Sequence, residues 1–260
     1  MTVWDALILG AIQGLAEFLP VSSSGHLLVF HRILGIDLAH LDNLTFLVVL
    51  NLGTLLPLLY IFRQDLLALL RNPVQRTVGL LLLATAPLII ATLLFADLIE
   101  GLFRSTEFLA FGFLLTGIIL ILSDQIKGNT KTINELRPID ALLIGIAQSV
   151  AVFPGLSRSG STIAAALGRG LNREEAAKFS FLMSIPAAFG ALAFRAIRMI
   201  TGHVAVADIN ILNLVVGFAA AAVTGYLSIN FMMALIKRAQ LKYFALFYVF
   251  GLAILIFILF

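Results

Sequence analysis

Cysteine is absent from this 260-residue sequence, and charged residues are scarce. Without cysteine the chain has no disulfide framework and no thiolate metal site. Charged residues make up 12% of the chain and hydrophobic residues 61%, a balance typical of an integral membrane protein. No HExxH, EF-hand, Walker or dinucleotide-binding motif is present, and nothing in the sequence supports a nucleic-acid partner.

The hydrophobic residues form long runs and do not alternate with the period of two that a spanning barrel requires. The sequence therefore predicts an all-α polytopic membrane protein. The first residues lack a basic region and a small-residue cleavage site, so we expect no removable signal peptide. Six stretches have the length and composition of a transmembrane helix, namely residues 44–62, 78–97, 108–123, 179–199, 210–230 and 243–260.

Two further regions, residues 3–35 and 138–170, contain short apolar segments interrupted by proline, glycine and serine. Each half is too short to span a bilayer. A break at membrane depth is tolerated only where protein or a water-filled cavity surrounds it. These regions predict two re-entrant helix-loop-helix hairpins.

The two broken regions resemble each other at an offset of 135 residues. "LILGAIQGLAEFLPVSSSGHL" (7–27) then matches "LLIGIAQSVAVFPGLSRSGST" (142–162), and "TFLVVLN" (45–51) falls on "SFLMSIP" (180–186). The identical pairs include Gly10 with Gly145, Gln13 with Gln148, Phe18 with Phe153, Ser22 with Ser157, Ser24 with Ser159, and Gly25 with Gly160. Chance matches in a sequence of low diversity are the alternative to a duplication.

A duplication predicts a single membrane domain over residues 1–260, with one repeat at about 1–125 and a second at about 136–260. Each repeat would hold one hairpin and three transmembrane helices. Because that number of full crossings is odd, the second repeat would lie upside down relative to the first. Interrupted segments in matching positions of inverted repeats indicate a binding site near the bilayer midplane.

The basic residues predict the orientation. Alternating spans place twelve of them on one side: Arg63, Arg71, Arg76, Lys127, Lys131, Arg137, Arg169, Arg173, Lys178, Lys237, Arg238 and Lys242. Only Arg32, Arg104, Arg195 and Arg198 fall on the other side. The positive-inside rule makes the first side cytoplasmic. Both termini and the mouth of the first hairpin would then face outward.

The first hairpin carries a cluster of polar groups. Gln13 and Glu17 are four residues apart and share one face of a helix. Pro20 ends that helix, and the serines that follow offer hydroxyls and free N–H groups at the start of the next helix, where anions bind. The groups of this second helix start are Ser22, Ser23, Ser24, Gly25 and His26.

The second hairpin repeats the construction in "PGLSRSGST" (154–162) and adds a cation. Arg158 is able to bind phosphate oxygens in a bidentate manner. Hydrogen-bond donors surround it, namely Ser157, Ser159, Gly160 and Thr162. Together the hairpins predict a binding site for phosphate or pyrophosphate with proton-transfer groups beside it.

Simpler interpretations exist for each residue. A serine after a proline commonly does no more than cap a helix. Glu17 and Arg158 would be costly at membrane depth and are functional candidates by default, although a structural ion pair is an alternative. The other histidines, His31, His40 and His203, lie in or near expected loops, and we interpret them as surface residues.

The motifs "QGLAEFLPVSSSGH" and "PGLSRSGST" resemble those of the undecaprenyl pyrophosphate phosphatases, also called bacitracin resistance proteins. The resemblance extends over the whole chain. It implies hydrolysis of undecaprenyl pyrophosphate to the monophosphate, which recycles a lipid carrier for cell-wall synthesis. It also implies the bacterial inner membrane, an outward-facing site, and a divalent cation, Mg²⁺ or Ca²⁺, without a dedicated all-protein site.

The same resemblance implies roles for individual residues. It assigns the acid and metal ligand to Glu17, the histidine to His26, the candidate nucleophile to Ser23 and the arginine to Arg158. An acid that the family often has at the start of the first motif is Gln13 here, which weakens any mechanism with two carboxylates on a metal.

The sequence leaves several alternatives open. The nucleophile is Ser23, His26 or water, and His26 is a candidate general base or acid because its ordinary pKa suits proton transfer at neutral pH. An inverted-repeat transporter or flippase for an anionic lipid phosphate would use the same helix starts and Arg158. The expected partners are undecaprenyl pyrophosphate and membrane lipid; a homodimer is neither required nor excluded.

Overall fold

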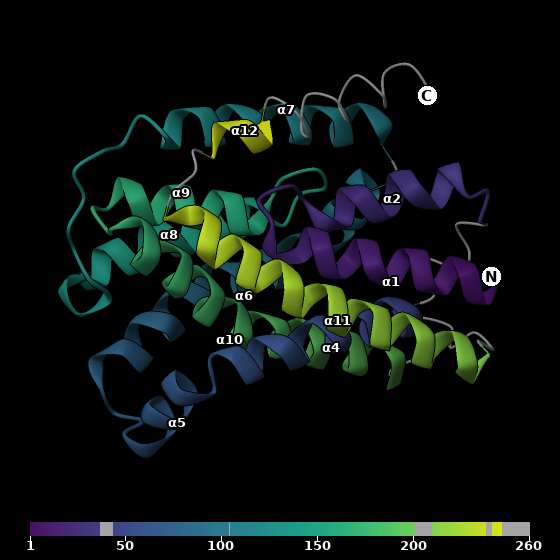
Figure 1. Cartoon of the computed structure of the whole chain (residues 1–260), viewed down its shortest axis with the longest axis horizontal. Coiled ribbons are helices and arrows are strands. Elements are labelled where there is room, and N and C mark those ends of the chain that lie inside the picture. Colours follow the sequence, from purple (N-terminus) through teal and green to yellow (C-terminus); the bar gives the residue numbers. More distant parts are fainter. Residues whose placement is uncertain (37–43, 104, 201–209, 238–240, 246–260) are drawn as a thin grey trace.

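The computed structural model describes residues 1–36, 44–103, 105–200, 210–237 and 241–245 (Figure 1). Within these residues the chain is helical and forms no β-strand; a single isolated bridge pairs Lys131 with Leu171. The prediction of an all-helical chain with several apolar helices is confirmed, as expected of a multi-pass membrane protein.

The helices follow one another along the described chain. They are α1 (Val3–Phe18), α2 (Ser23–Ile33), α4 (Leu44–Ile61), α5 (Arg63–Arg71), α6 (Arg76–Leu102), α7 (Thr106–Ser123), the short 3₁₀ helix η1 (Ile133–Glu135), α8 (Pro138–Val150), α9 (Arg158–Gly168), α10 (Arg173–Ile200), α11 (Ile211–Ile236) and α12 (Lys242–Phe244).

Three described helices contain segments long and apolar enough to cross a membrane: Arg76–Ile99, Arg173–Arg198 and Ile211–Ile236. Helices α4 and α5 meet the same criterion only as a pair, with a bend of 77° between them. The predicted spans at 44–62, 78–97, 108–123, 179–199 and 210–230 coincide with α4, α6, α7, α10 and α11. The predicted span at 243–260 lies outside the described residues except for its first three.

The two broken regions form helix-turn-helix pairs, α1 with α2 and α8 with α9. Helix α1 ends at Phe18 because Leu19 is extended (φ −71°, ψ 149°), as a residue before proline tends to be. In the second turn Gly155 has a φ of +82°, and a Cβ there would lie 2.3 Å from the carbonyl oxygen of Leu109. Only glycine fits that turn.

Each pair packs its first helix on a long helix from the other half of the chain. Helix α1 lies along α11, where a Cβ on Gly10 would approach the carbonyl oxygen of Gly217 to 2.3 Å. Helix α8 lies along α6, where a Cβ on Gly145 would approach the carbonyl oxygen of Ala84 to 2.4 Å. Glycine therefore allows the same close backbone approach in both pairs.

The next helix of each half, α4 and α10, also packs on a long helix of the other half. Helix α4 of the first half packs on α11, and its expected counterpart α10 packs on α6. Helices α4 and α10 also contact each other. The packing partners in one half thus recur in the other half with the partners exchanged.

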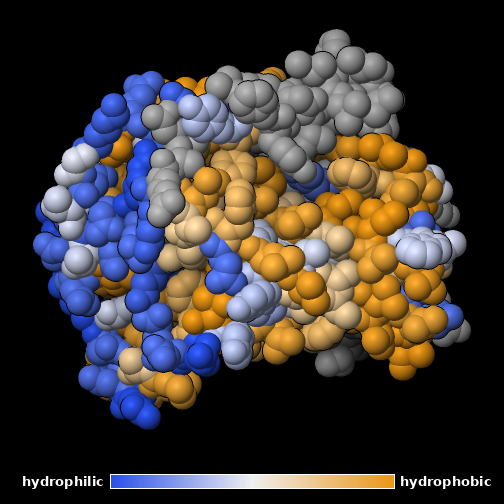
Figure 2. Space-filling model, viewed as in Figure 1, coloured by the Kyte–Doolittle hydropathy of each residue, from blue (hydrophilic) through white to orange (hydrophobic). Residues whose placement is uncertain are grey.

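Hydrophilic side chains gather at one end of the molecule (Figure 2). Segments distant in sequence are joined there: the Lys178–Asp65 pair has an N–O distance of 2.6 Å, and the Arg173–Asp124 pair one of 2.9 Å. Arg76 donates to the carbonyl oxygen of residue 134 at 2.7 Å. The N-terminus, next to which α1 begins, lies at the opposite end (Figure 1). Helix α8 begins at the hydrophilic end, so α1 and α8 begin at opposite ends of the molecule.

Candidate functional site

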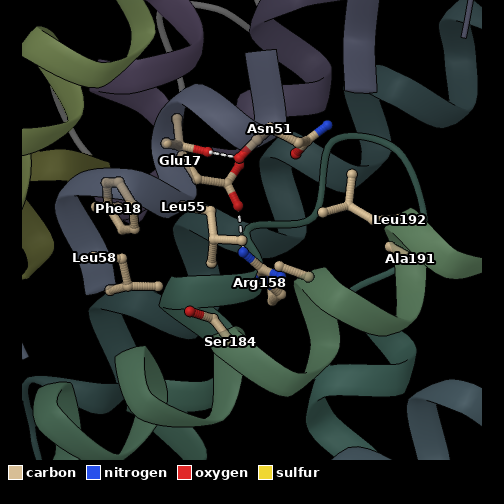
Figure 3. Close-up of a pocket in the computed structure, with 11 residues that line it drawn as sticks. Glu17, Phe18, Asn51, Leu55, Leu58, Arg158, Ser184, Ala191 and Leu192 are labelled. Atoms are coloured by element: carbon tan, nitrogen blue, oxygen red, sulfur yellow. Dashed lines mark hydrogen bonds and ion pairs between the residues drawn. The ribbon is translucent and has the colours of Figure 1, made fainter. Parts of the chain in front are cut away.

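The turns of the two helix pairs meet in the interior of the molecule. Glu17, in the last turn of α1, forms an ion pair with Arg158, the first residue of α9 (Figure 3). The Ser159 hydroxyl donates a hydrogen bond of 2.9 Å to the carbonyl oxygen of Leu19. Two segments more than a hundred residues apart in sequence therefore build one site.

Three donors converge on the Glu17 carboxylate. Its Oε1 accepts from Nη2 of Arg158, and its Oε2 accepts from the Ser23 hydroxyl at 2.7 Å and from Nε2 of Gln13 at 3.1 Å. Ser23 and Arg158 are each the first residue of a helix, α2 and α9. Two helix N-termini thus surround one carboxylate, an arrangement that favours anions.

A cavity of about 60 Å³ adjoins this ion pair. Its walls come from α1, α4, α9 and α10, so both halves of the chain contribute (Figure 3). Glu17 and Arg158 are the charged groups that line it. The other lining residues are Phe18, Asn51, Thr54, Leu55, Leu58, Ser184, Ala188, Ala191 and Leu192.

The rest of the first turn faces away from this cavity. Ser22 has a φ of 69°, and its Oγ accepts a 3.4 Å hydrogen bond from the Gly25 N–H and lies 3.5 Å from the Ser24 Oγ. His26 is buried: its Nδ1 donates to the Ser22 carbonyl oxygen at 2.6 Å, and its ring packs edge to face on Phe113. His26 does not belong to the cavity lining.

In the second turn, side chains other than Arg158 serve the backbone. The Ser157 Oγ accepts from the Gly160 N–H at 3.1 Å and lies 3.2 Å from the Ser159 Oγ. The Thr162 hydroxyl donates to the Arg158 carbonyl oxygen at 2.8 Å. These hydroxyls hold the start of α9 in place, so Arg158 is the member of the predicted set that reaches the cavity from this turn.

Sequence reasoning missed several polar residues of the site. Asn51, on α4, lines the cavity, and its Oδ1 lies 3.5 Å from Nε2 of Gln13. Thr54 and Ser184 line it as well. Asn51 interrupts an apolar run, and a polar residue within a predicted span was the available signal.

A divalent cation has few protein ligands here. The described residues contain no group of three His, Asp or Glu side chains that would hold a metal. Glu17 supplies the one carboxylate of the described cavity lining, and Asn51, on α4, lines the same cavity with its side-chain amide. Mg²⁺ is commonly held by one or two carboxylates together with substrate phosphates. The residues fit a cation held jointly with the substrate.

Comparisons with known proteins give a consistent result. A family model described as bacitracin resistance protein BacA matches residues 6–255. An undecaprenyl-diphosphatase of Carboxydothermus hydrogenoformans is 42% identical over 258 residues, which cover 98% of this chain and 97% of that protein. Undecaprenyl-diphosphatase 3 of Bacillus cereus is 40% identical over 255 residues, which cover 98% and 96%. An undecaprenyl-diphosphatase of Methanobrevibacter smithii is 36% identical over 266 residues, which cover 94% and 93%.

Proposed function

Since the chain belongs to the bacitracin resistance protein BacA family, we propose that it hydrolyses undecaprenyl pyrophosphate to undecaprenyl phosphate and inorganic phosphate. The activity is that named for its relatives, whose full length this chain shares. The observation that carries the assignment to a site is the Glu17–Arg158 pair, which joins the end of α1 to the start of α9 beside a cavity.

Arg158 binds the pyrophosphate in this proposal. Its guanidinium has five donors, and Glu17 occupies part of them. Phosphate oxygens would take the place of the Glu17 carboxylate on Arg158, helped by the N-termini of α2 and α9. This exchange would free Glu17 to act on Ser23, whose hydroxyl already donates to it at 2.7 Å.

The chemical step follows from that hydrogen bond. The Ser23 Oγ attacks the terminal phosphorus and passes its proton to Glu17; the bond from that phosphorus to the bridging oxygen breaks, and undecaprenyl phosphate leaves. Water then attacks the phosphorus of the phosphoseryl group, the bond to the Ser23 Oγ breaks, and Glu17 returns its proton to that oxygen, which releases inorganic phosphate and restores Ser23. A water molecule attacking directly is the alternative nucleophile. A divalent cation held by Glu17 and the substrate would neutralise phosphate charge, on which phosphoryl transfer depends.

The role of His26 stays a prediction. Its ring lies against Phe113, outside the cavity lining, and its Nδ1 holds the Ser22 carbonyl oxygen. A proton-transfer role would require the ring to reach the substrate. Wild-type turnover in His26→Ala would remove His26 from the mechanism.

The proposal extends to topology. Two inverted repeats, each with a re-entrant hairpin, are supported by the exchanged packing partners and by the start of α1 and α8 at opposite ends of the molecule. The hydrophilic end of the molecule in Figure 2 would be cytoplasmic, on the positive-inside rule. The same orientation supports a site open to the outer face, whereas the inner-membrane location and the homodimer that we add to the proposal rest on the family alone.

The test is phosphate release from a prenyl pyrophosphate by the detergent-purified protein, with and without a chelator. Arg158→Ala and Glu17→Gln are expected to lose about 10²- to 10³-fold in turnover, the usual cost of removing a preorganised charge partner. Lys178→Ala, which removes a pair with Asp65 at the molecular surface, is the control and should keep wild-type activity.

Two outcomes would change the assignment. Folded wild-type protein that binds the substrate but releases no phosphate would favour the transport alternative. For the nucleophile, acid-quenched protein is analysed for phosphoserine at Ser23. Substantial activity in Ser23→Ala without a trapped intermediate would assign the attack to water.

A further inference from the structure

The cavity beside the ion pair has an apolar lip on α10. Ser184, Ala188 and Ala191 lie on one face of α10 and pass from buried through half-buried to exposed. Figure 3 shows Ala191 and the half-buried Leu192 on the wall of the cavity to one side of Arg158. The cavity therefore opens to the surface across an alanine and leucine edge.

This edge lies on a helix with the length and composition of a membrane span. Other apolar side chains of the two helices in contact here are exposed: Phe189, on α10, is 52% and Leu52, on α4, is 39% exposed. A membrane-spanning α10 would present this surface to lipid. One cavity thus combines the charged groups of Glu17 and Arg158 with an apolar edge on α10.

We propose that the lip formed by Ala188, Ala191 and Leu192 is the specificity site for the lipid tail, and that it binds the isoprenoid units next to the pyrophosphate. This inference rests on the proposed function. Small side chains at 188 and 191 leave room for a branched chain to lie across α10, and Leu192 supplies apolar contact. The small volume of the cavity encloses head-group atoms only, so the rest of the tail stays in the bilayer.

The inference is tested by binding, with ligands that cannot be hydrolysed. Farnesyl and methyl methylenebisphosphonates share a head group and differ in the tail, and their affinities are measured by isothermal titration calorimetry in one detergent. In Ala191→Phe the new ring covers the lip. The farnesyl analogue should bind about tenfold more weakly, and the methyl analogue should be unaffected, since a mismatch in an apolar site costs this order of affinity.

Ala193→Phe is the matched control, because Ala193 is an exposed alanine of α10 outside the cavity lining. It should bind both analogues as the wild type does. Equal weakening of both analogues in Ala191→Phe, equal effects of the two phenylalanine variants, or no effect of either would each overturn the inference. Failure of the proposed function would appear separately, as absence of phosphate release from prenyl pyrophosphate by protein that still binds the farnesyl analogue.

Discussion

The two hairpins share one scaffold and divide the chemistry between them. At the offset of 135 residues, Glu17 of the first hairpin corresponds to Val152 of the second, and Arg158 of the second corresponds to Ser23 of the first. One hairpin thus supplies the acid and a hydroxyl, and the other supplies the cation. The ion pair forms where their turns meet, so two segments of similar sequence build an asymmetric site.

The two matching glutamines show the same division. Nε2 of Gln13 donates to Glu17 at 3.1 Å and takes part in the site. Nε2 of Gln148 donates to the Ala84 carbonyl oxygen at 3.3 Å and joins α8 to α6. With no acid at position 152, the second glutamine serves packing. The same residue type at matching positions of the two hairpins therefore makes different interactions.

The largest expected difference between the two hairpins is at the start of the first helix of each. Asp140, at the start of α8, is fully buried and accepts from Nε and Nη2 of Arg169 at 2.8 and 2.6 Å. The corresponding Asp5 caps α1 through Thr2. Asp140→Ala is expected to destabilise the fold by about 2–4 kcal/mol, because it removes the charge-assisted hydrogen bonds from Arg169, which is partly exposed, and the acceptor for the Arg137 N–H at the start of α8. Asp5→Ala should cost about 1 kcal/mol.

Thermal unfolding of both variants in one detergent measures this difference. Asp5→Ala is the matched control, since it removes the equivalent carboxylate from the other hairpin. Similar losses for the two variants would show that Arg169 does not depend on Asp140 for its pairing.

The glycine contacts should respond alike in both hairpins. Gly10→Ala would place a Cβ 2.3 Å from a facing carbonyl oxygen, and Gly145→Ala would place one at 2.4 Å. Each is expected to destabilise the protein by about 1–3 kcal/mol, the usual cost of overpacking. Gly79→Ala, in α6 with open space around it, is the control and should be neutral or stabilising. A loss confined to one hairpin, seen in thermal unfolding, would break the equivalence.

The smallest expected effect concerns the N-cap residues of α2 and α9, where the same substitution should change stability in opposite directions. Ser22 has a φ of 69°, whereas the corresponding Ser157 has a φ of −80°. Ser22→Gly should be neutral or stabilising by roughly 0.5–1 kcal/mol, because glycine adopts a positive φ without strain. Ser157→Gly should be destabilising by up to about 1 kcal/mol through the lost cap and the added backbone entropy. Unfolding temperatures that move in the same direction would contradict this expectation.

Much of the fold followed from the lengths of the apolar runs. The hydrophobic effect and the need to satisfy every backbone group in lipid make run length a strong signal, so five predicted spans coincide with described helices. Helix α5 was not predicted, because it is short, contains charged residues and follows a 77° bend after α4. The bend depends on tertiary packing, which the length of an apolar run does not report.

The site was predictable in its charges and less so in its hydroxyls. An acid and an arginine in broken segments are expensive at membrane depth, which singled out Glu17 and Arg158. A serine or threonine carries no such cost, and its direction depends on the local turn. Ser157 and Thr162 bind backbone, whereas Ser23 reaches Glu17. Asn51 is a polar residue within a predicted span, but its proximity to Gln13 depends on how α4 packs against α1.

The sequence by itself determined that this chain is helical and apolar, that it contains two similar interrupted segments, and which family it belongs to. These properties are local or additive along the chain. Only the tertiary structure decided that the acid of one segment meets the arginine of the other, that His26 is buried against Phe113, and that α10 forms the edge of the cavity. Such contacts join residues far apart in the chain, and they arise from how the helices pack.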